Sequence, residues 1–247
     1  MAHRRHSGPL TVQRPFYPEG EVCHVYLLHP PGGIVAGDQL AINLSAESAS
    51  NALVTTPAAG KFYRSDGALA RQTVTIRIAD HASLEWLPQE TIIYEGANMA
   101  SALHLELAAA ARFIGWEIAA LGRPAAGEGF SAGLAKLSWQ ITRAGVLLYK
   151  ERLLIDALAF AARWGLHGHS ACGTLFAYPA TRAQLTAVQA LIGDRPELGV
   201  TLIDELLVCR ALDHRADLLR AFFWQVWAAL RPGVLQRPAC TPRIWAT

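Results

Sequence analysis

One serine lies between two glycines in the pattern of a catalytic elbow. Residues 129–133 read Gly-Phe-Ser-Ala-Gly, and in α/β-hydrolases GxSxG places the nucleophile on a strained turn between a strand and a helix. Here a segment rich in Gly and Pro precedes Ser131, and an alternating, strand-like segment follows it. Asp204 and His214 could complete a triad, but their local contexts are undistinguished. A plain glycine loop is the favoured interpretation, and a serine hydrolase using Ser131 is the alternative.

Two groups of metal-binding residue types are also present. His167 and His169 lie close to Cys172, and Cys23 precedes His24. A structural zinc site needs four ligands, usually supplied as two spaced pairs, and no second pair completes the first group. The second group falls on an expected strand, where neighbouring side chains point to opposite faces. We expect structural roles for both groups and no tightly bound metal.

The segments that would position these residues are mostly strands. Apolar and polar residues alternate over 73–78, 103–107 and 134–142, which is typical of strands with one buried face. The runs 146–149 and 206–208 are short and continuously apolar. We expect these two runs to be strands that are buried on both faces.

Two segments late in the chain have helical spacing instead. Thr181 is a suitable N-cap for a helix over 181–192, which Gly193 would end. A broad apolar stripe predicts a second helix over 215–230, before Pro232-Gly233. Helices that follow a long series of strands argue against alternating βαβ units. The sequence therefore predicts a mainly β protein with two α-helices in the C-terminal half, built as a single domain over 1–247.

Composition excludes several classes of protein. The chain has 52% hydrophobic and 17% charged residues, with a net charge of +2, which is too balanced for a nucleic-acid-binding protein. The most apolar long stretch, 102–121, contains four charged or histidine residues, so we expect no membrane span. Four cysteines without a CxxC pair, and a first decapeptide without an apolar core, indicate a protein of the reducing cytoplasm without a signal peptide.

Taken in order, several segments resemble the UreD (UreH) family of urease accessory proteins. No single block decides the matter, but the ordered set is specific and runs over nearly the whole chain. The resembling blocks are 8–20 (GPLTVQRPFYPEG), 30–38 (PPGGIVAGD), 55–65 (TTPAAGKFYRS), 84–90 (LEWLPQE), 115–117 (GWE), 121–124 (LGRP), 127–130 (GEGF) and 242–247 (PRIWAT).

The resemblance implies a superhelical stack of β-sheets that carries two helices and has no chemistry of its own. It further implies a scaffold that binds apo-urease and the accessory protein UreF, which recruits the nickel-carrying GTPase UreG. Nickel would pass through an interior tunnel to urease. Family members usually have another strand's worth of residues before the first block, so the opening strand is expected to be short or missing. An unrelated β-rich binding module is a further alternative.

A nickel conduit must hold the ion weakly, because conduction requires release as well as entry. Nickel(II) accepts carboxylate, imidazole and water, and scattered carboxylates around a hydrated ion would suffice. Asp38, Glu117 and Glu151 are the candidates for a transient nickel path, since they lie beside glycine or apolar segments. Lys61 is a candidate partner cation or interface residue near this path. Ordinary salt bridges or exposed side chains are the alternative for each.

The C-terminal segment 214–247 is expected to be a docking or packing element. Its predicted helix is rich in aromatic residues, which are enriched both in cores and at interface hot spots. Trp224 lies off the main apolar stripe of that helix. It is therefore the candidate for contact with a partner protein.

Overall fold

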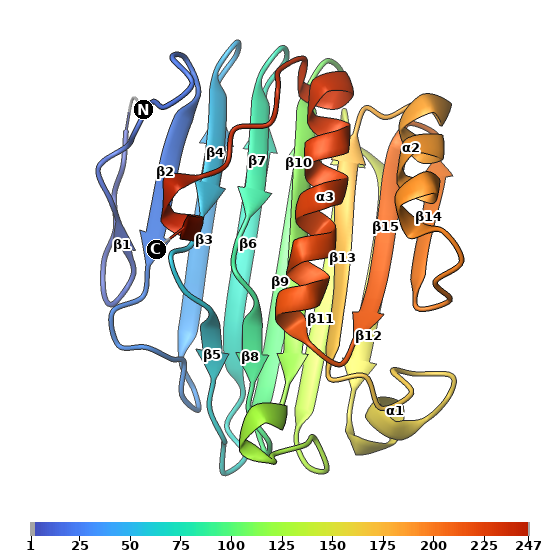
Figure 1. Cartoon of the computed structure of the whole chain (residues 1–247). Helices are drawn as coiled ribbons and strands as arrows, with labels where there is room; N and C mark the ends of the chain where they lie inside the picture. Colours follow the sequence, from blue (N-terminus) through green and yellow to red (C-terminus); the bar gives the residue numbers. More distant parts are fainter. Residues whose placement is uncertain (1–2, 247) are drawn as a thin grey trace.

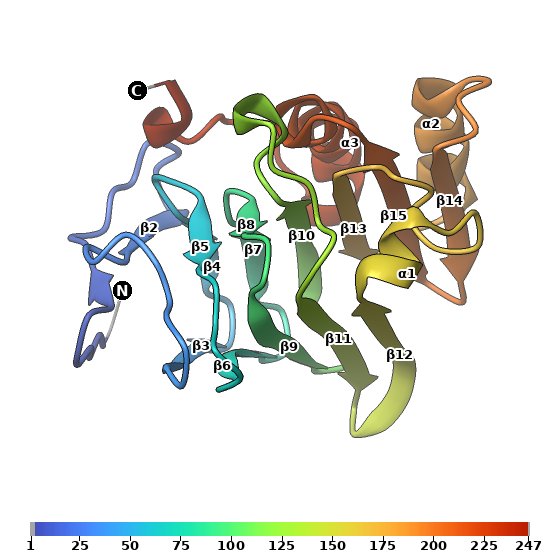
Figure 2. The same cartoon turned by 90° about the horizontal axis from the view of Figure 1, so that it is seen from below.

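The computed structural model describes residues 3–246 and shows two β-sheets packed face to face (Figures 1 and 2). The larger sheet has ten strands, with β5 and β8 attached beside β10. In spatial order its main path is β1 (Thr11–Val12), β2 (Cys23–Leu28), β4 (Asn51–Thr55), β7 (Ser83–Leu87), β10 (Arg112–Leu121), β13 (Ala171–Tyr178), β15 (Leu206–Asp213) and β14 (Leu198–Ile203), and the attached strands are β5 (Gly60–Phe62) and β8 (Thr91–Ile93).

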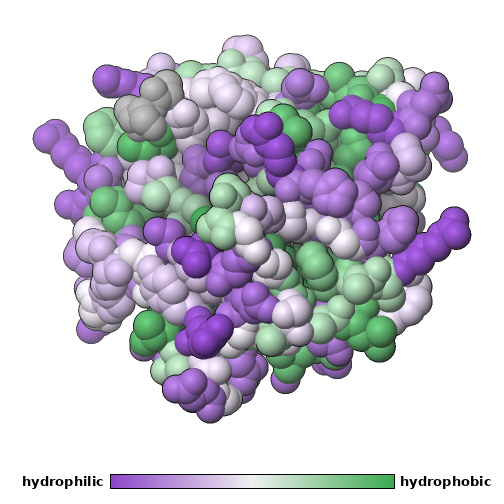
Figure 3. All heavy atoms as spheres, turned by 60° about the horizontal axis from the view of Figure 1, so that its bottom comes forward, coloured by the Kyte–Doolittle hydropathy of each residue, from purple (hydrophilic) through white to green (hydrophobic). Residues whose placement is uncertain are grey.

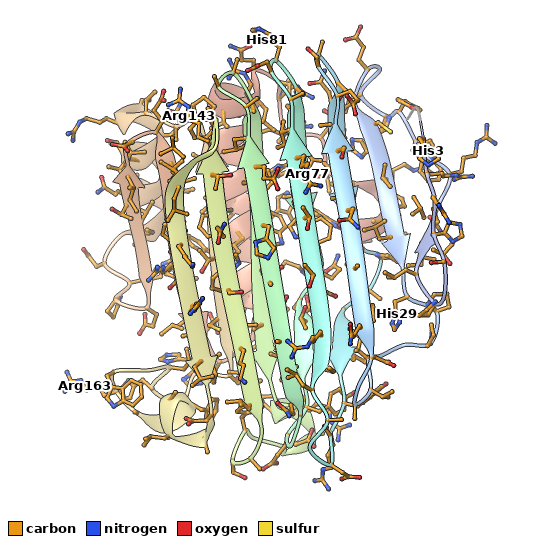
Figure 4. The ribbon with its side chains drawn as sticks, turned by 180° about the vertical axis from the view of Figure 1, so that it is seen from behind. His3, His29, Arg77, His81, Arg143 and Arg163 are labelled. Carbon is orange, nitrogen blue, oxygen red and sulfur yellow. The ribbon has the colours of Figure 1, made fainter. Side chains whose placement is uncertain are left out.

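The smaller sheet has five strands, and no helix within residues 3–246 covers its outer face (Figure 4). Its order is β12 (Val146–Ile155), β11 (Leu134–Arg143), β9 (Asn98–Leu107), β6 (Ala70–Ile78) and β3 (Gln39–Ala46). Each of the three alternating segments predicted from the sequence lies within one of these strands: β6, β9 or β11.

The chain winds as a superhelix because it alternates between the two sheets. From β2 to β11 it places parallel neighbours in each sheet, such as β4 beside β7 in the larger sheet and β6 beside β9 in the smaller. Strands β12 and β13 then pair antiparallel with β11 and β10. The mainly β, superhelical architecture implied by the resemblance is confirmed.

Both predicted helices are present, on the outer face of the larger sheet (Figure 2). Helix α2 (Arg182–Ile192) begins with a capping box at Thr181 and ends at Gly193. Helix α3 (Ala216–Leu235) continues through Pro232, beyond the predicted end, because its last turn buries Val234 and Leu235 in the core. Within residues 3–246, no helix has the length and apolar character needed to cross a membrane.

A short third helix, α1 (Ala157–Ala161), was not predicted from the sequence. Its five residues are too few to show helical periodicity. The Asp156 side chain caps it by accepting a hydrogen bond from the Ala159 amide. Two 3₁₀ turns, Pro124–Ala126 and Arg243–Ala246, complete the elements.

Strand alternation divides the buried side chains into two cores. On β10, Phe113 faces the space between the sheets, whereas Ile114 and Trp116 face α3. Burial on both faces at 206–208 is confirmed, since these residues are at most 2% exposed. The same prediction for 146–149 is wrong: β12 is the edge strand of the smaller sheet, and Val146 is 70% exposed.

Candidate functional site

A cavity of about 320 Å³ lies between the two sheets, beside the segment that follows α1 and the edge strands β12 and β14. Much of its wall is apolar, including Met99 and Leu137. Polar or thiol side chains interrupt this wall, among them Ser101, Glu117, Trp139, Glu151, Cys172 and Arg210. They come from β9, β10, β11, β12, β13 and β15. The superhelical winding therefore brings together residues that are far apart in the sequence.

Glu117 occupies a position where the strand pattern normally places an apolar residue. On β10 it alternates with Trp116 and Ile118, which pack against α3, so the carboxylate points into the space between the sheets. Its antiparallel neighbour on β13 is Thr174, which also lines the cavity. Glu117 therefore lies within a strand that is paired with its neighbour, and not in a loop, so the position of its carboxylate is well defined.

Burial raises the pKa of Glu117 to about 7, because an apolar environment disfavours the ionised carboxylate. The indole N–H of Trp139 lowers this pKa in part, although it is not placed for a regular hydrogen bond. Both the protonated and the ionised form of Glu117 are therefore populated at neutral pH.

Glu151 has partners that Glu117 lacks. One of its oxygens pairs with Arg210 at 2.8 Å, and the other accepts a hydrogen bond of 2.5 Å from the Tyr149 hydroxyl. Arg210 also donates to the Tyr149 oxygen at 2.6 Å. Burial, followed by the hydrogen bond to Glu151, raises the pKa of Tyr149 to about 12. Tyr149 therefore stays neutral and holds the Glu151 carboxylate in place.

Cys172 is the cysteine that lines the cavity together with these carboxylates. Burial, with a smaller contribution from the charge of Glu151, raises the pKa of its thiol to about 12. A protonated thiol is a poor metal ligand. Among residues 3–246, no three His, Cys, Asp or Glu side chains form a group placed to hold a metal ion. His169 instead stacks on His214, with ring centroids 4.4 Å apart.

Asp38 and Lys61 do not line this cavity. Asp38 ends the loop before β3, where its carboxylate accepts a hydrogen bond of 3.0 Å from the Val35 amide. Lys61 pairs in register with Ile92 on β8, whereas the flanking Thr91 and Ile93 line the cavity. Since side chains alternate along a strand, Lys61 faces away from the cavity.

Ser131 lies in an exposed loop, where its hydroxyl donates to the Glu95 carboxylate. The next element is the strand β11, whereas a nucleophile elbow continues into a helix. The glycines around Ser131 therefore form a connection into the smaller sheet.

A buried ionic cluster on the other side of the larger sheet was missed in the sequence. Arg231 of α3 donates to Glu85 of β7 and to Glu19, and Glu19 also contacts His24 at 2.7 Å. Trp227 donates a further hydrogen bond of 2.6 Å to Glu85. The available signal was a charge inside an apolar pattern: Glu85 stands between Leu and Trp, and Arg231 continues the helical stripe.

Comparison with known proteins identifies the family. The family model of the UreD urease accessory protein matches residues 1–246. Three relatives, each named urease accessory protein UreD, are similar along their length. That of Citrobacter koseri is 46% identical over all of this chain and 86% of its own. That of Hahella chejuensis is 45% identical over 98% and 84%, and that of Pseudomonas putida GB-1 is 46% identical over 98% and 87%. The chain belongs to the UreD family of urease accessory proteins.

Proposed function

We propose that this chain acts in urease maturation as a scaffold without an enzymatic activity of its own. It binds apo-urease and UreF, is linked through UreF to the GTPase UreG, and passes nickel toward the urease site. The observation that carries the proposal is that Glu117 and Glu151, which belong to different sheets, line one cavity in a chain of the UreD family. The four cysteines, all unpaired, suit work in the reducing cytoplasm.

The chemistry of the cavity suits passage better than storage. Nickel(II) accepts carboxylate and water ligands, and a water molecule takes about 30 Å³ of liquid volume. A cavity of about 320 Å³ therefore has room for an ion with its first hydration shell. Protonation of Glu117 and the pairing of Glu151 with Arg210 both compete with the metal. The ion would be held weakly and transiently, and no cofactor would remain bound.

Asp38 and Lys61 belong to the proposal only as residues of the route outside the cavity. Asp38 stands in the loop between β2 and β3, and Lys61 stands on β5. The proposal for the cavity depends on neither residue, so their variants report on a separate part of the route.

The decisive experiment is urease activation at limiting nickel with Glu117→Gln, Glu151→Gln and the double variant. We expect each single change to lower nickel incorporation, because a rise of about 1.4 kcal/mol in the barrier slows passage about tenfold. Glu106→Gln is the matched control, since Glu106 pairs with Arg77 on the exposed outer face of the smaller sheet. Asp38→Ala tests the outer route in the same assay.

Pull-down of UreF and urease by the same variants separates conduction from assembly. The complex should survive, because Glu117 and Glu151 lie between the sheets. Normal nickel content of urease with the double variant would remove both residues from the path. Loss of the complex together with activation would show that the two carboxylates are structural.

A further inference from the structure

Arg210 closes the side of the cavity that faces solvent. It projects from β15 of the larger sheet and reaches Glu151 on β12, the edge strand of the smaller sheet. Its side chain is 55% exposed, whereas that of Glu151 is 20% exposed. The guanidinium therefore lies between the cavity and the surrounding water. The exposed Glu197, in the segment before β14, lines the cavity on the same side.

We propose that Arg210 is the gate of this cavity: its guanidinium occupies the place beside Glu151 that an entering divalent cation takes, and it swings into solvent when the cation arrives. The inference rests on the proposed function of the cavity as a nickel route. It assigns Arg210 a positioning role, since the residue acts through Glu151 and carries the same sign of charge as the metal.

The Arg210–Glu151 contact is built to open. An ion pair with one largely exposed member is weak, because water competes for both charges. The contrast within this chain is Arg231, whose side chain is 0% exposed and which bonds two carboxylates. Arg231 has no access to solvent, whereas the Arg210 side chain can rotate into water, where its charge is well solvated.

Opening would leave the cavity ready to accept the ion. Tyr149 donates to the second oxygen of Glu151, so the carboxylate keeps its position after Arg210 leaves. A carboxylate that exchanges a guanidinium for a metal ion is never left unpaired in a partly buried site, which would be costly. The cation therefore replaces a charge rather than adding one to an empty pocket.

Equilibrium dialysis of the untagged full-length chain against nickel(II) tests the gate. Arg210→Met removes the competing cation but keeps most of the side chain, so nickel should bind about tenfold more tightly. The matched control is Arg143→Met. Arg143, on β11 of the smaller sheet, also forms a salt bridge toward the larger sheet, with Glu205 between β14 and β15 at 3.2 Å. Arg143 lies at the end of β11 that is far from α1 and Arg163 (Figure 4). The control should bind nickel like the unmodified chain.

Exposed histidines such as His3, His6 and His81 would give background nickel binding, which all variants share, so the comparison isolates the cavity. In a Glu151→Gln background, Arg210→Met should lose its effect. Unchanged affinity in Arg210→Met, with weaker binding in Glu151→Gln, would overturn the gate but leave the nickel route standing. Nickel affinity that is unchanged by substitution of Glu117, Glu151 or Arg210 would overturn both the gate and the nickel route.

Thermal melting distinguishes the gate from a structural bridge. A bridge that only joins the two sheets would lower the melting temperature on substitution without tightening nickel binding, and that result would overturn the proposal. If Arg210→Met does not fold, Arg210→Gln makes the same change of charge with a polar side chain. Arg210→Lys keeps the charge and should retain nickel affinity near that of the unmodified chain.

Discussion

Arg231 of α3 and Glu85 of β7 form a buried ion pair across 146 residues of sequence, with Nε and Oε1 3.0 Å apart. Both residues are at most 1% exposed. Glu19 accepts a further hydrogen bond of 2.8 Å from Arg231. This contact joins the last long helix to the larger sheet and to the segment before β2.

We expect Arg231→Met to destabilise the chain by about 3–5 kcal/mol, because it leaves the buried carboxylate of Glu85 and the largely covered carboxylate of Glu19 without their cation. Chemical denaturation of the full-length chain measures the change. Arg77→Met is the control: Arg77 pairs with Glu106 on the exposed face seen in Figure 4, and its loss should cost less than about 1 kcal/mol. Equal effects of the two substitutions would refute the importance of the buried cluster.

The stability of the protein should depend on pH through Glu117. Its pKa is about 7 in the folded chain against an ordinary value of 4.5, so the folded state binds more protons between these values. The contribution of Glu117 therefore stabilises the fold at low pH and is lost as pH rises toward 7. Glu117→Gln should raise the melting temperature at pH 8 relative to the unmodified chain, with less gain at pH 5. An identical difference at both pH values would contradict the assignment.

Trp224 is suited to contact a partner. It is 40% exposed on α3 and meets the edge of Trp245, with ring centroids 5.6 Å apart. Trp224→Ala should weaken binding to the proposed partners, UreF and urease, by about 1 kcal/mol or more, while the melting temperature changes little. Trp227→Ala is the contrasting variant and should destabilise the fold strongly, because Trp227 is fully buried and bonds Glu85. Unfolding by Trp224→Ala would place Trp224 in the core.

The chain should be poorly soluble without its partners. Trp164, Leu158 and Leu154 are 74%, 67% and 54% exposed, and apolar patches interrupt the polar surface in Figure 3. Exposed apolar groups of this kind favour association. Co-expression with UreF should raise the soluble fraction, and Trp164→Ser should raise it even without UreF. A concentrated, monomeric preparation of the unmodified chain alone would count against this expectation.

Much of the fold could be predicted because its determinants are local. Alternation indicated β6, β9 and β11, and the cap at Thr181 fixed the start of α2. The exposure of Val146 could not be predicted in this way, because it depends on β12 being an edge strand. Which strand ends a sheet is a property of the whole topology and not of the residues within the strand.

The candidate site was predictable only in part, for the same reason. Glu117 and Glu151 attract attention as carboxylates in apolar surroundings, but they approach one cavity only because β10 and β12 belong to facing sheets. Arg210 gave no local signal, since its role depends on reaching across from β15 to Glu151. Asp38 resembled the other two carboxylates in sequence, yet its loop lies outside the cavity.

The position of α3 after the last strand of the larger sheet has a consequence for synthesis on the ribosome. The apolar face of β10, with Ile114 and Trp116, is covered by α3, which ends at Leu235. At a synthesis rate of about 5–20 residues per second, this face waits on the order of ten seconds for its cover. During that interval the nascent sheet exposes apolar side chains, and Glu85 awaits Arg231. Folding of the larger sheet can therefore be completed only after α3 has been synthesised, and until then its apolar face is open to contact with other proteins.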